Sequence, residues 1–188
     1  MHEIKIITQG KELLALKPEG FLDYVNSLFE EKALINVEKA LTLDEEKEWL
    51  KQSAERMDRG ELVMVLLFVD GRLAGIADAW SGAITLRHNV TFGISVRKEH
   101  RGQKYGTLLL RTAIDYAKDY FKPHKMWIEY AEGNEIASRF YEKMGFVPVS
   151  RLGEYIFQYG EYHNKIVMEY RGDKPKETGP EMPAQPSF

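Results

Sequence analysis

The chain has 188 residues, a length that suits one domain with a well-buried core. Its hydrophobic fraction of 44% and its aromatic fraction of 12% are typical of a folded globular protein. The net charge of −3 argues against a general nucleic-acid binder, and the absence of cysteine excludes a disulfide framework and a thiol nucleophile.

Patterns within the chain disfavour further classes of protein. No apolar run approaches the ~18 residues that a membrane helix needs, and the first residues do not follow a signal-peptide pattern. The five histidines stand far apart, so a histidine-based metal site is not expected. These patterns predict a cytoplasmic protein without a metal, a membrane segment or a nucleic-acid partner.

Strand and helix patterns follow one another along the chain. In order, they predict a strand over 3–8, a helix over 18–32, a helix after residue 42, strands over 62–69, 73–80 and 87–97, a helix over 104–121, a strand over 125–131, a helix over 134–144, and strands over 146–158 and 162–171. Thr42 and Glu45 form a capping box, Asp70-Gly71 favours a type I′ hairpin turn, and Gly145 suits the position after a helix.

These elements predict a single domain over residues 1–171. From Gly172 onward the sequence is Pro-rich, polar and aperiodic. Such a composition cannot bury a core, so residues 172–188 are expected to form a flexible C-terminal tail.

A basic loop between a strand and a helix is the most informative segment. The apolar run Phe92–Val96 leads into the loop Arg101–Gly106, and an amphipathic helix follows directly. A glycine-containing turn at a helix N-terminus presents unpaired N–H groups at the positive end of the helix dipole, which suits a phosphate. Four basic residues cluster there: Arg97, Lys98, Arg101 and Lys104. The alternative is an ordinary turn with a solvated basic loop, because the GxxxxGKS/T and GxGxxG phosphate motifs are absent.

The sequence downstream separates these two interpretations. The loop Arg101–Gly106 resembles the Q/R-x-x-G-x-G/A pyrophosphate loop of the GNAT superfamily of acyl-CoA-dependent N-acetyltransferases, with Lys104 in place of the usual glycine. A second GNAT signature is matched by Asn134 and by Tyr141–Phe146. The segments Arg151–Tyr155 and Tyr159–Asn164 resemble the branch that contains ribosomal-protein and polyamine N-acetyltransferases.

This resemblance implies a mixed α/β (α+β) fold. A GNAT-like domain has a strongly twisted, mostly antiparallel central sheet of six or seven strands, splayed in the middle and flanked by about four helices. It also implies that acetyl-CoA and an amine acceptor are the partners, with a homodimer left open. The residues that it implies for the cofactor are Ile94, Ser95, Val96, Arg101, Gly102, Gln103, Lys104, Tyr105, Gly106, Thr107 and Asn134.

Two residues are implied to be catalytic. Tyr141 protonates the leaving thiolate in the family, and Glu129 stands where several relatives carry a general base. Seven residues separate Asn134 from Tyr141, so on a helix their directions differ by only about 20° and they lie about 10 Å apart along the axis. The alternatives are a helix cap for Asn134, a half-buried aromatic for Tyr141 and a solvated pair of Trp127 and Glu129.

The acceptor is predicted to be a primary amine, with a protein or peptide N-terminus preferred over a polyamine or other small amine. An α-amine loses its proton more easily than a lysine-like amine, and Glu129 is the single plausible base in the sequence. Against this preference stand Glu132 and Glu135, which could hold the second ammonium of spermidine. We expect Lys104 to have a helical φ angle, with its ammonium near a phosphate.

Two functions of other classes stay open. One is a non-catalytic acyl-CoA-binding module, for which Lys104 at a glycine position is the only sign. The other is a structural protein that binds its partner along the exposed edge of its last strand.

Overall fold

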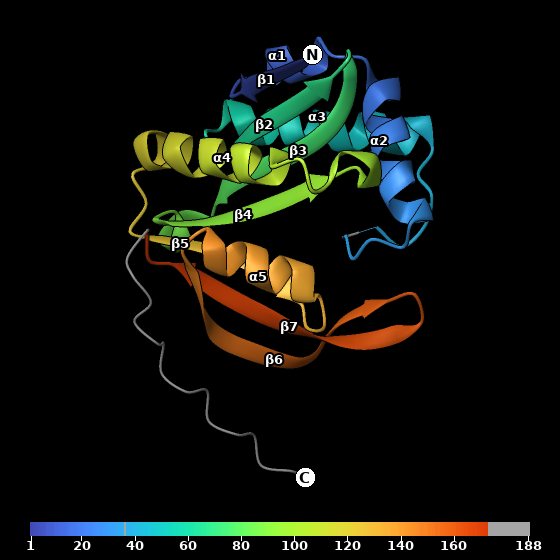
Figure 1. Cartoon of the computed structure of the whole chain (residues 1–188). Helices are drawn as coiled ribbons and strands as arrows, with labels where there is room; N and C mark the ends of the chain where they lie inside the picture. Colours follow the sequence, from blue (N-terminus) through green and yellow to red (C-terminus); the bar gives the residue numbers. More distant parts are fainter. Residues whose placement is uncertain (36, 173–188) are drawn as a thin grey trace.

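A seven-stranded sheet runs through the molecule in the order β1-β2-β3-β4-β5-β7-β6. The computed structural model describes residues 1–35 and 37–172 (Figure 1). The strands are β1 (His2–Ile7), β2 (Leu62–Val69), β3 (Arg72–Ser81), β4 (Asn89–Val96), β5 (Lys125–Ala131), β6 (Phe146–Gln158) and β7 (Glu161–Tyr170). The helices are α1 (Gly10–Leu14), α2 (Pro18–Glu30), α3 (Leu43–Asp58), α4 (Tyr105–Phe121) and α5 (Glu135–Lys143), with 3-10 turns η1 (Ile84–Leu86) and η2 (Lys98–His100).

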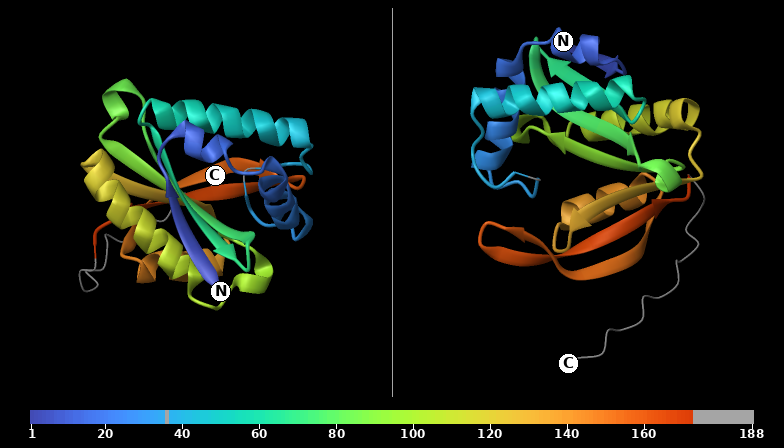
Figure 2. Two further views of the ribbon diagram at one scale, coloured as in Figure 1. Left: turned by 90° about the horizontal axis from the view of Figure 1, so that it is seen from above. Right: turned by 180° about the vertical axis from the view of Figure 1, so that it is seen from behind.

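Helices cover both faces of this sheet. Strand β2 is apolar and buried from Leu62 to Leu67 because it has a core on each side. Met64 and Leu66 pack with residues of α1, α2 and α3, whereas Val65 and Leu67 belong to the cluster that α4 and α5 cover. Figure 2, seen from behind, shows α3 in front of the sheet and α4 beyond it.

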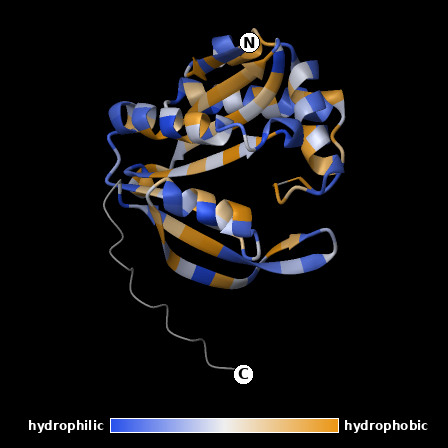
Figure 3. Ribbon diagram, viewed as in Figure 1, coloured by the Kyte–Doolittle hydropathy of each residue, from blue (hydrophilic) through white to orange (hydrophobic). Residues whose placement is uncertain are grey.

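The apolar sequence pattern of helix α4 explains how this helix packs on the sheet. Its apolar side chains repeat at helical spacing, and those that are buried are Leu109, Leu110, Ala113, Ile114 and Ala117. Hydrophobic and hydrophilic bands alternate along α4 in Figure 3. The apolar face lies on β2, β3 and β4, which fixes the position of the helix N-terminus beside the end of β4.

The sheet opens between its two central strands. All neighbouring strands are antiparallel except β4 and β5, which are parallel and pair only over 89–92 and 125–128. Beyond that point β4 continues along β3, while β5 continues along β7 (Figure 1). The edge of residues 93–96 that faces β5 is therefore open, which confirms the expected mostly antiparallel sheet of seven strands, splayed in the middle.

The local signals are confirmed. Thr42 and Glu45 cap α3 reciprocally. Asp70 and Gly71 both have positive φ angles, 49° and 79°, as a type I′ turn requires. Gly145 has a φ of 92°, and an added Cβ would lie 2.6 Å from the carbonyl oxygen of Gly172, so only glycine fits there.

Two features differ from expectation. Helix α1 was not predicted, because five residues are too short to show a period; it packs on α3, where the Gly10 N–H donates to Asp58 at 2.8 Å. The last strand, β7, is not an exposed edge, since it pairs with β5 on one side and β6 on the other. Sequence order does not reveal such a crossover. The predicted tail lies outside the described residues except for Gly172.

Candidate active site

The turn between β4 and α4 leaves several backbone N–H groups without a partner. The first hydrogen bond into the helix runs from the Leu108 N–H to the Lys104 carbonyl at 3.1 Å. Within the described part of the chain, the N–H groups of residues 103–107 have no hydrogen-bond acceptor. They stand at the positive end of the α4 dipole, so this turn can bind an anion such as a pyrophosphate.

Lys104 does not have the helical φ angle that we expected. Its φ and ψ are 65° and 5°, in the left-handed region. The chain must turn sharply from Gly102, which also has a positive φ of 76°, to direct the first N–H groups of α4 outward. A glycine adopts this conformation without strain, whereas for lysine the left-handed conformation costs roughly 1–2 kcal/mol.

Arg101 is occupied by contacts within the protein. Its Nε donates to the Val96 carbonyl at 2.9 Å, and its guanidinium forms an ion pair with Glu31 at the end of α2. These contacts tie the turn to β4 and α2. Arg101 therefore positions the backbone N–H groups of the turn, and its charge is shared with Glu31.

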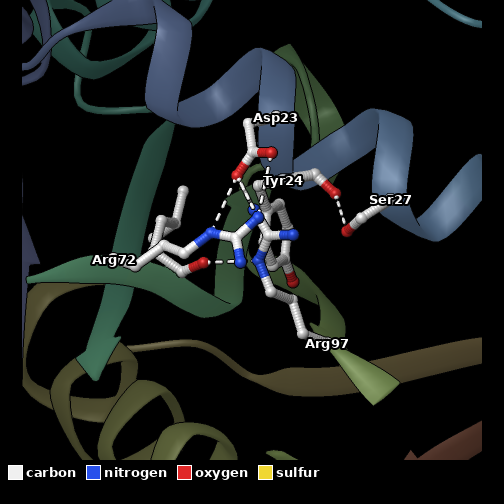
Figure 4. A network of polar contacts seen from close by, with 6 residues as sticks. Asp23, Tyr24, Ser27, Arg72 and Arg97 are labelled. Carbon is white, nitrogen blue, oxygen red and sulfur yellow. Dashed lines mark hydrogen bonds and ion pairs between the residues drawn. The ribbon is translucent and has the colours of Figure 1, made fainter. Parts of the chain in front are cut away.

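Arg97 is a second basic residue with a structural role. It is 1% exposed, its Nε donates to the Leu73 carbonyl at 2.7 Å, and it binds Asp23 of α2 at 2.5 Å. Figure 4 shows Arg72 and Arg97 converging on this carboxylate. Burial tends to raise the pKa of Asp23, but the Arg72 hydrogen bond and the charges of both arginines outweigh it and lower the pKa. With the Tyr24–Ser95 hydrogen bond of 2.8 Å, these contacts fix the end of β4 to α2.

The open edge of β4 presents two N–H groups. Alternate residues of a strand direct their N–H groups to opposite edges. The Arg97 N–H reaches the Ala74 carbonyl on β3, so the N–H groups of Ile94 and Val96 face the gap on the β5 side. Ser95 instead directs its N–H toward β3 and its hydroxyl toward Tyr24.

A cleft of about 1240 Å³ opens beside this edge. It lies between α2, α3, residues 34–35 and 37–41, β3, β4, β5 and β6. The predicted residues that line it are Ile94, Ser95, Glu129, Asn134 and Tyr141. The turn of residues 101–107 lies outside the cleft. Aromatic side chains dominate the wall: Phe21, Tyr24, Trp49, Trp80, Phe92, Tyr130, Tyr155 and Phe157.

The structural roles of Asn134 and Tyr141 are compatible with the functional roles that the family resemblance implies for them. Asn134 caps α5, because its Oδ1 accepts from the Ala137 N–H at 3.1 Å. Tyr141 is 7% exposed, and its ring packs 5.7 Å from that of Tyr130 and 6.2 Å from that of Phe146. Burial raises the pKa of Tyr141, and the nearby Tyr130 and Asp78 raise it further. Its hydroxyl therefore stays protonated and able to donate.

The acidic residues near Glu129 are engaged in local pairs. Glu129 accepts a hydrogen bond of 2.8 Å from Lys165, whose ammonium lies 3.9 Å from the centre of the Tyr155 ring. Glu132 binds Arg151 at 2.7 Å, and Glu135 lies 3.8 Å from Arg139. Neither Glu132 nor Glu135 lines the cleft. The expectation that these two residues could hold an ammonium of the acceptor is therefore not supported.

The sequence analysis missed Asp78, a carboxyl group in the cleft. It lies on β3 opposite Gly93, and a Cβ at Gly93 would come within 2.4 Å of its Oδ1. Burial raises the pKa of Asp78 to about 6, against the opposing effects of the Asp78 and Gly93 N–H groups and of Arg56. The signal in the sequence was a single charged residue within the run 73–80.

Glu46 was missed as well. It is 3% exposed and lines the cleft from the first turn of α3. Within residues 1–35 and 37–172 its carboxyl group has no hydrogen-bond or ion-pair partner. Burial raises its pKa to about 7. The helical spacing of Glu46 with Leu50, Ala54 and Met57 places it on the apolar face of α3 and could have revealed it.

The described residues show neither a membrane-spanning helix nor a metal-binding cluster. No helix there is both long and apolar enough to cross a membrane. No group of three histidine or acidic side chains in the same part of the chain is arranged to hold a metal ion.

The splayed sheet, the turn with unpaired N–H groups and the buried tyrosine beside the gap are the features that the GNAT resemblance led us to expect. Residues 24–146 match the sequence model of the acetyltransferase (GNAT) family. The chain belongs to this family.

Curated relatives differ in what they act on. A streptothricin acetyltransferase from Streptomyces lavendulae is 33% identical over 100 residues, which are 51% of this chain and 50% of the relative. A spermidine N(1)-acetyltransferase from Vibrio cholerae is 30% identical over 79 residues, 42% of this chain and 46% of the relative. The chain thus spans about half the length of these relatives.

Solved structures share the fold at low identity. The ribosomal-protein-S5-alanine acetyltransferase of Vibrio fischeri superposes with a TM-score of 0.76 at 17% identity, covering 93% of this chain and 96% of that one. The protein yncA of Salmonella typhimurium, determined with its cofactor acetyl-CoA, gives a TM-score of 0.72 at 18% identity, covering 94% and 98%.

Proposed function

We propose that this protein transfers the acetyl group of acetyl-CoA directly to a primary amine in a ternary complex. The observation that carries this proposal is the buried Tyr141, which lines the cleft beside the open edge of β4. The free N–H groups of residues 103–107 suit the pyrophosphate. The N–H group of Val96, with Asn134, suits the pantetheine arm.

Acetyl-CoA supplies a thioester, whose carbonyl carbon accepts the amine and whose sulfur leaves. The chain must then polarise the carbonyl, take a proton from the amine and give one to the sulfur. The N–H of Ile94 is placed to donate to the carbonyl oxygen. Tyr141 keeps its proton because burial raises its pKa, so we assign it as the acid.

The proton of the amine must pass to a base, either directly or through water. Glu129 is one candidate, but its carboxylate is bound by the Lys165 ammonium. Asp78 is the other, and within the described residues no cation forms an ion pair with it. Its pKa of about 6 leaves it ionised and still basic near neutral pH, which general base catalysis favours. We therefore propose Asp78 as the base, with Glu129 second.

The decisive test removes only the Tyr141 hydroxyl. Tyr141→Phe should lower kcat by roughly 10²- to 10⁴-fold, because proton donation acts in the transition state. Acetyl-CoA affinity, measured by calorimetry, should change little. Tyr130→Phe, one ring away in the same wall, is the matched control and should stay near wild type. A Tyr141→Phe enzyme that retains more than about half of kcat would assign the proton to water instead.

The preferred acceptor is a peptide or protein N-terminal amine. An α-amine has a pKa of about 7.7–8.0 and a lysine-like amine about 10.4, so the cost of deprotonation at pH 7 differs by roughly 3 kcal/mol. Values of kcat/KM for short peptides with free N-termini, spermidine and blocked lysine peptides over pH 6–9 test this choice. Turnover of spermidine without turnover of any free N-terminus would overturn it. CoA binding without turnover of any amine would favour a non-catalytic module.

A further inference from the structure

Glu46 combines deep burial with the lack of a partner. Only 3% of its surface is exposed, and its side chain forms part of the cleft wall. Among the described residues no fully buried side-chain oxygen lacks a hydrogen bond, so the carboxyl oxygens of Glu46, which have no partner, keep some exposure to the cleft. A carboxylate held in such a largely buried place without a counter-charge is costly. Such a group in a binding cleft is commonly completed by a ligand.

The carboxylate next to it in sequence is already satisfied. Glu45 binds Lys39 at 2.5 Å and accepts hydrogen bonds from Thr42. These contacts lower the pKa of Glu45 to about 2, with the Lys39 hydrogen bond as the largest cause. The two neighbours on α3 thus have opposite environments, and of the two only Glu46 presents to the cleft a carboxyl group that no described residue binds.

The surroundings of Glu46 suit an organic cation. Trp49 lies one turn further along the same helix and is 40% exposed, and Trp49 and Trp80 both line the cleft. Aromatic faces attract an ammonium or guanidinium group. Hydrogen bonds from such a group to a carboxylate are charge-assisted and among the stronger ones in proteins.

The chain before α3 is tied to other parts of the molecule. Residues 34, 35, 37–39 and 41 line the cleft, and the side chain of Gln158 at the end of β6 donates to the Val37 carbonyl at 3.1 Å. The Tyr159 hydroxyl donates to the Ala33 carbonyl at 3.0 Å, and Asn26 of α2 binds both backbone groups of Leu41. Glu46 therefore faces a cleft whose walls are fixed before a ligand arrives.

We propose that Glu46 forms a subsite for a second positively charged group of the acceptor, an ammonium or a guanidinium. This inference rests on the proposed function, because it assigns the other end of a molecule whose primary amine is acetylated near Tyr141. The second charge could belong to a free diamine or to a basic side chain of a peptide. Both sources present the same chemistry to the carboxylate.

The test compares acceptors that differ only in the second charge. The first arm compares kcat/KM for 1,6-diaminohexane with kcat/KM for hexylamine. The second arm makes the same comparison between the dipeptides Ala-Lys and Ala-norleucine, both with blocked carboxyl ends, and uses a blocked lysine as the reference. In at least one arm the wild type should prefer the dication by roughly tenfold or more, the worth of a charge-assisted hydrogen bond. Glu46→Gln should reduce this ratio to near one.

A control on the same helix guards against indirect effects. Glu48 is exposed, accepts a hydrogen bond of 2.9 Å from Gln52 and does not line the cleft, so Glu48→Gln should keep the preference. No preference in the wild type, or the same preference in Glu46→Gln, overturns the subsite. The arm that responds identifies the source of the charge.

Failure of the proposed function is separable from failure of the subsite. If no amine is acetylated, the proposed function fails, and calorimetry of 1,6-diaminohexane and hexylamine with wild type and Glu46→Gln still decides the subsite. Tighter binding of the diamine that is lost in Glu46→Gln supports it. Equal binding of the two amines by the wild type overturns it.

Discussion

Asp78 and Tyr141 approach the same gap from opposite faces of the sheet. The side chain of Asp78 lies over Gly93, on the α2 and α3 side. Tyr141 belongs to the core on the α4 and α5 side and is close enough for its pKa to respond to the charge of Asp78. Because β4 separates from β5, both side chains line the same cleft.

The assignment of Asp78 predicts the pH dependence of the reaction. A base must be ionised, so kcat/KM should rise as pH passes through the Asp78 pKa of about 6. Above that pH Asp78 is fully ionised and should cause no further rise. Asp78→Asn should lower kcat by roughly 10²- to 10⁴-fold and remove this rise. Glu129→Gln, which also loses the ion pair with Lys165, is the comparison. If Glu129→Gln removes the rise and Asp78→Asn keeps it, the two roles are exchanged.

Glu46 should make stability fall as pH rises. Its pKa is raised from 4.5 to about 7 in the folded protein, so the fold favours the protonated form. The resulting penalty is absent below the unfolded pKa, grows as pH rises toward 7 and stays constant above it. Glu46→Gln should therefore increase the free energy of unfolding at pH 8 by roughly 2–3 kcal/mol and leave it unchanged near pH 4.

Urea unfolding of wild type, Glu46→Gln and Glu48→Gln over this pH range measures the effect. Glu48→Gln should follow the wild type throughout. A Glu46→Gln protein that is less stable than wild type at pH 8 would mean that the carboxylate has a stabilising partner.

At the scale of elements, Lys104 gives the turn into α4 a positive charge but strains its backbone. Lys104→Gly relieves a left-handed lysine, so the melting temperature should rise, corresponding to about 1 kcal/mol. The same change removes an ammonium from the anion-binding turn, so CoA affinity measured by calorimetry should fall. A rise in both quantities would show that the Lys104 ammonium does not contact a phosphate.

Local sequence signals predicted the helices, strands and turns better than they predicted which charged side chains are paired within the protein. The capping box at Thr42 and the turn at Asp70-Gly71 depend on residues a few positions apart, so the sequence contains their whole cause. The occupation of Arg101 by Glu31 depends on two segments meeting in space. Sequence spacing predicted the turn before α4 but not which of its basic side chains are already paired within the protein.

The two carboxyl groups in the cleft show the same limit. Asp78 occupies an alternating strand position, where a polar residue usually faces solvent, and Glu46 lies in a helix first turn, where acidic residues are common. Their burial comes from α2, α3 and residues 34–35 and 37–41, which cover this part of the sheet. Glu129, Asn134 and Tyr141 were predicted from the family resemblance, and the structure brings them to the same cleft.

At the scale of the whole molecule, the sheet consists of two groups of strands joined at one short ladder. Strands β1 to β4 are neighbours in sequence and in space, whereas β5, β7 and β6 pair out of order. The two groups meet through four residue pairs between β4 and β5. The cleft lies where that ladder ends, so the acceptor is expected to contact both groups of strands at once.

The order of the outer strands also bears on self-association. A free strand edge can extend a neighbouring molecule's sheet if its N–H and carbonyl groups form an unbroken row. Here one edge strand, β1, has six residues, and the other, β6, contains Pro148 and shifts register twice, between Pro148 and Ser150 and between Leu152 and Ile156. The long strand β7 is enclosed and has no free edge. The short β1 and the irregular β6 are poor templates for another sheet, so the sheet is protected from edge-to-edge aggregation.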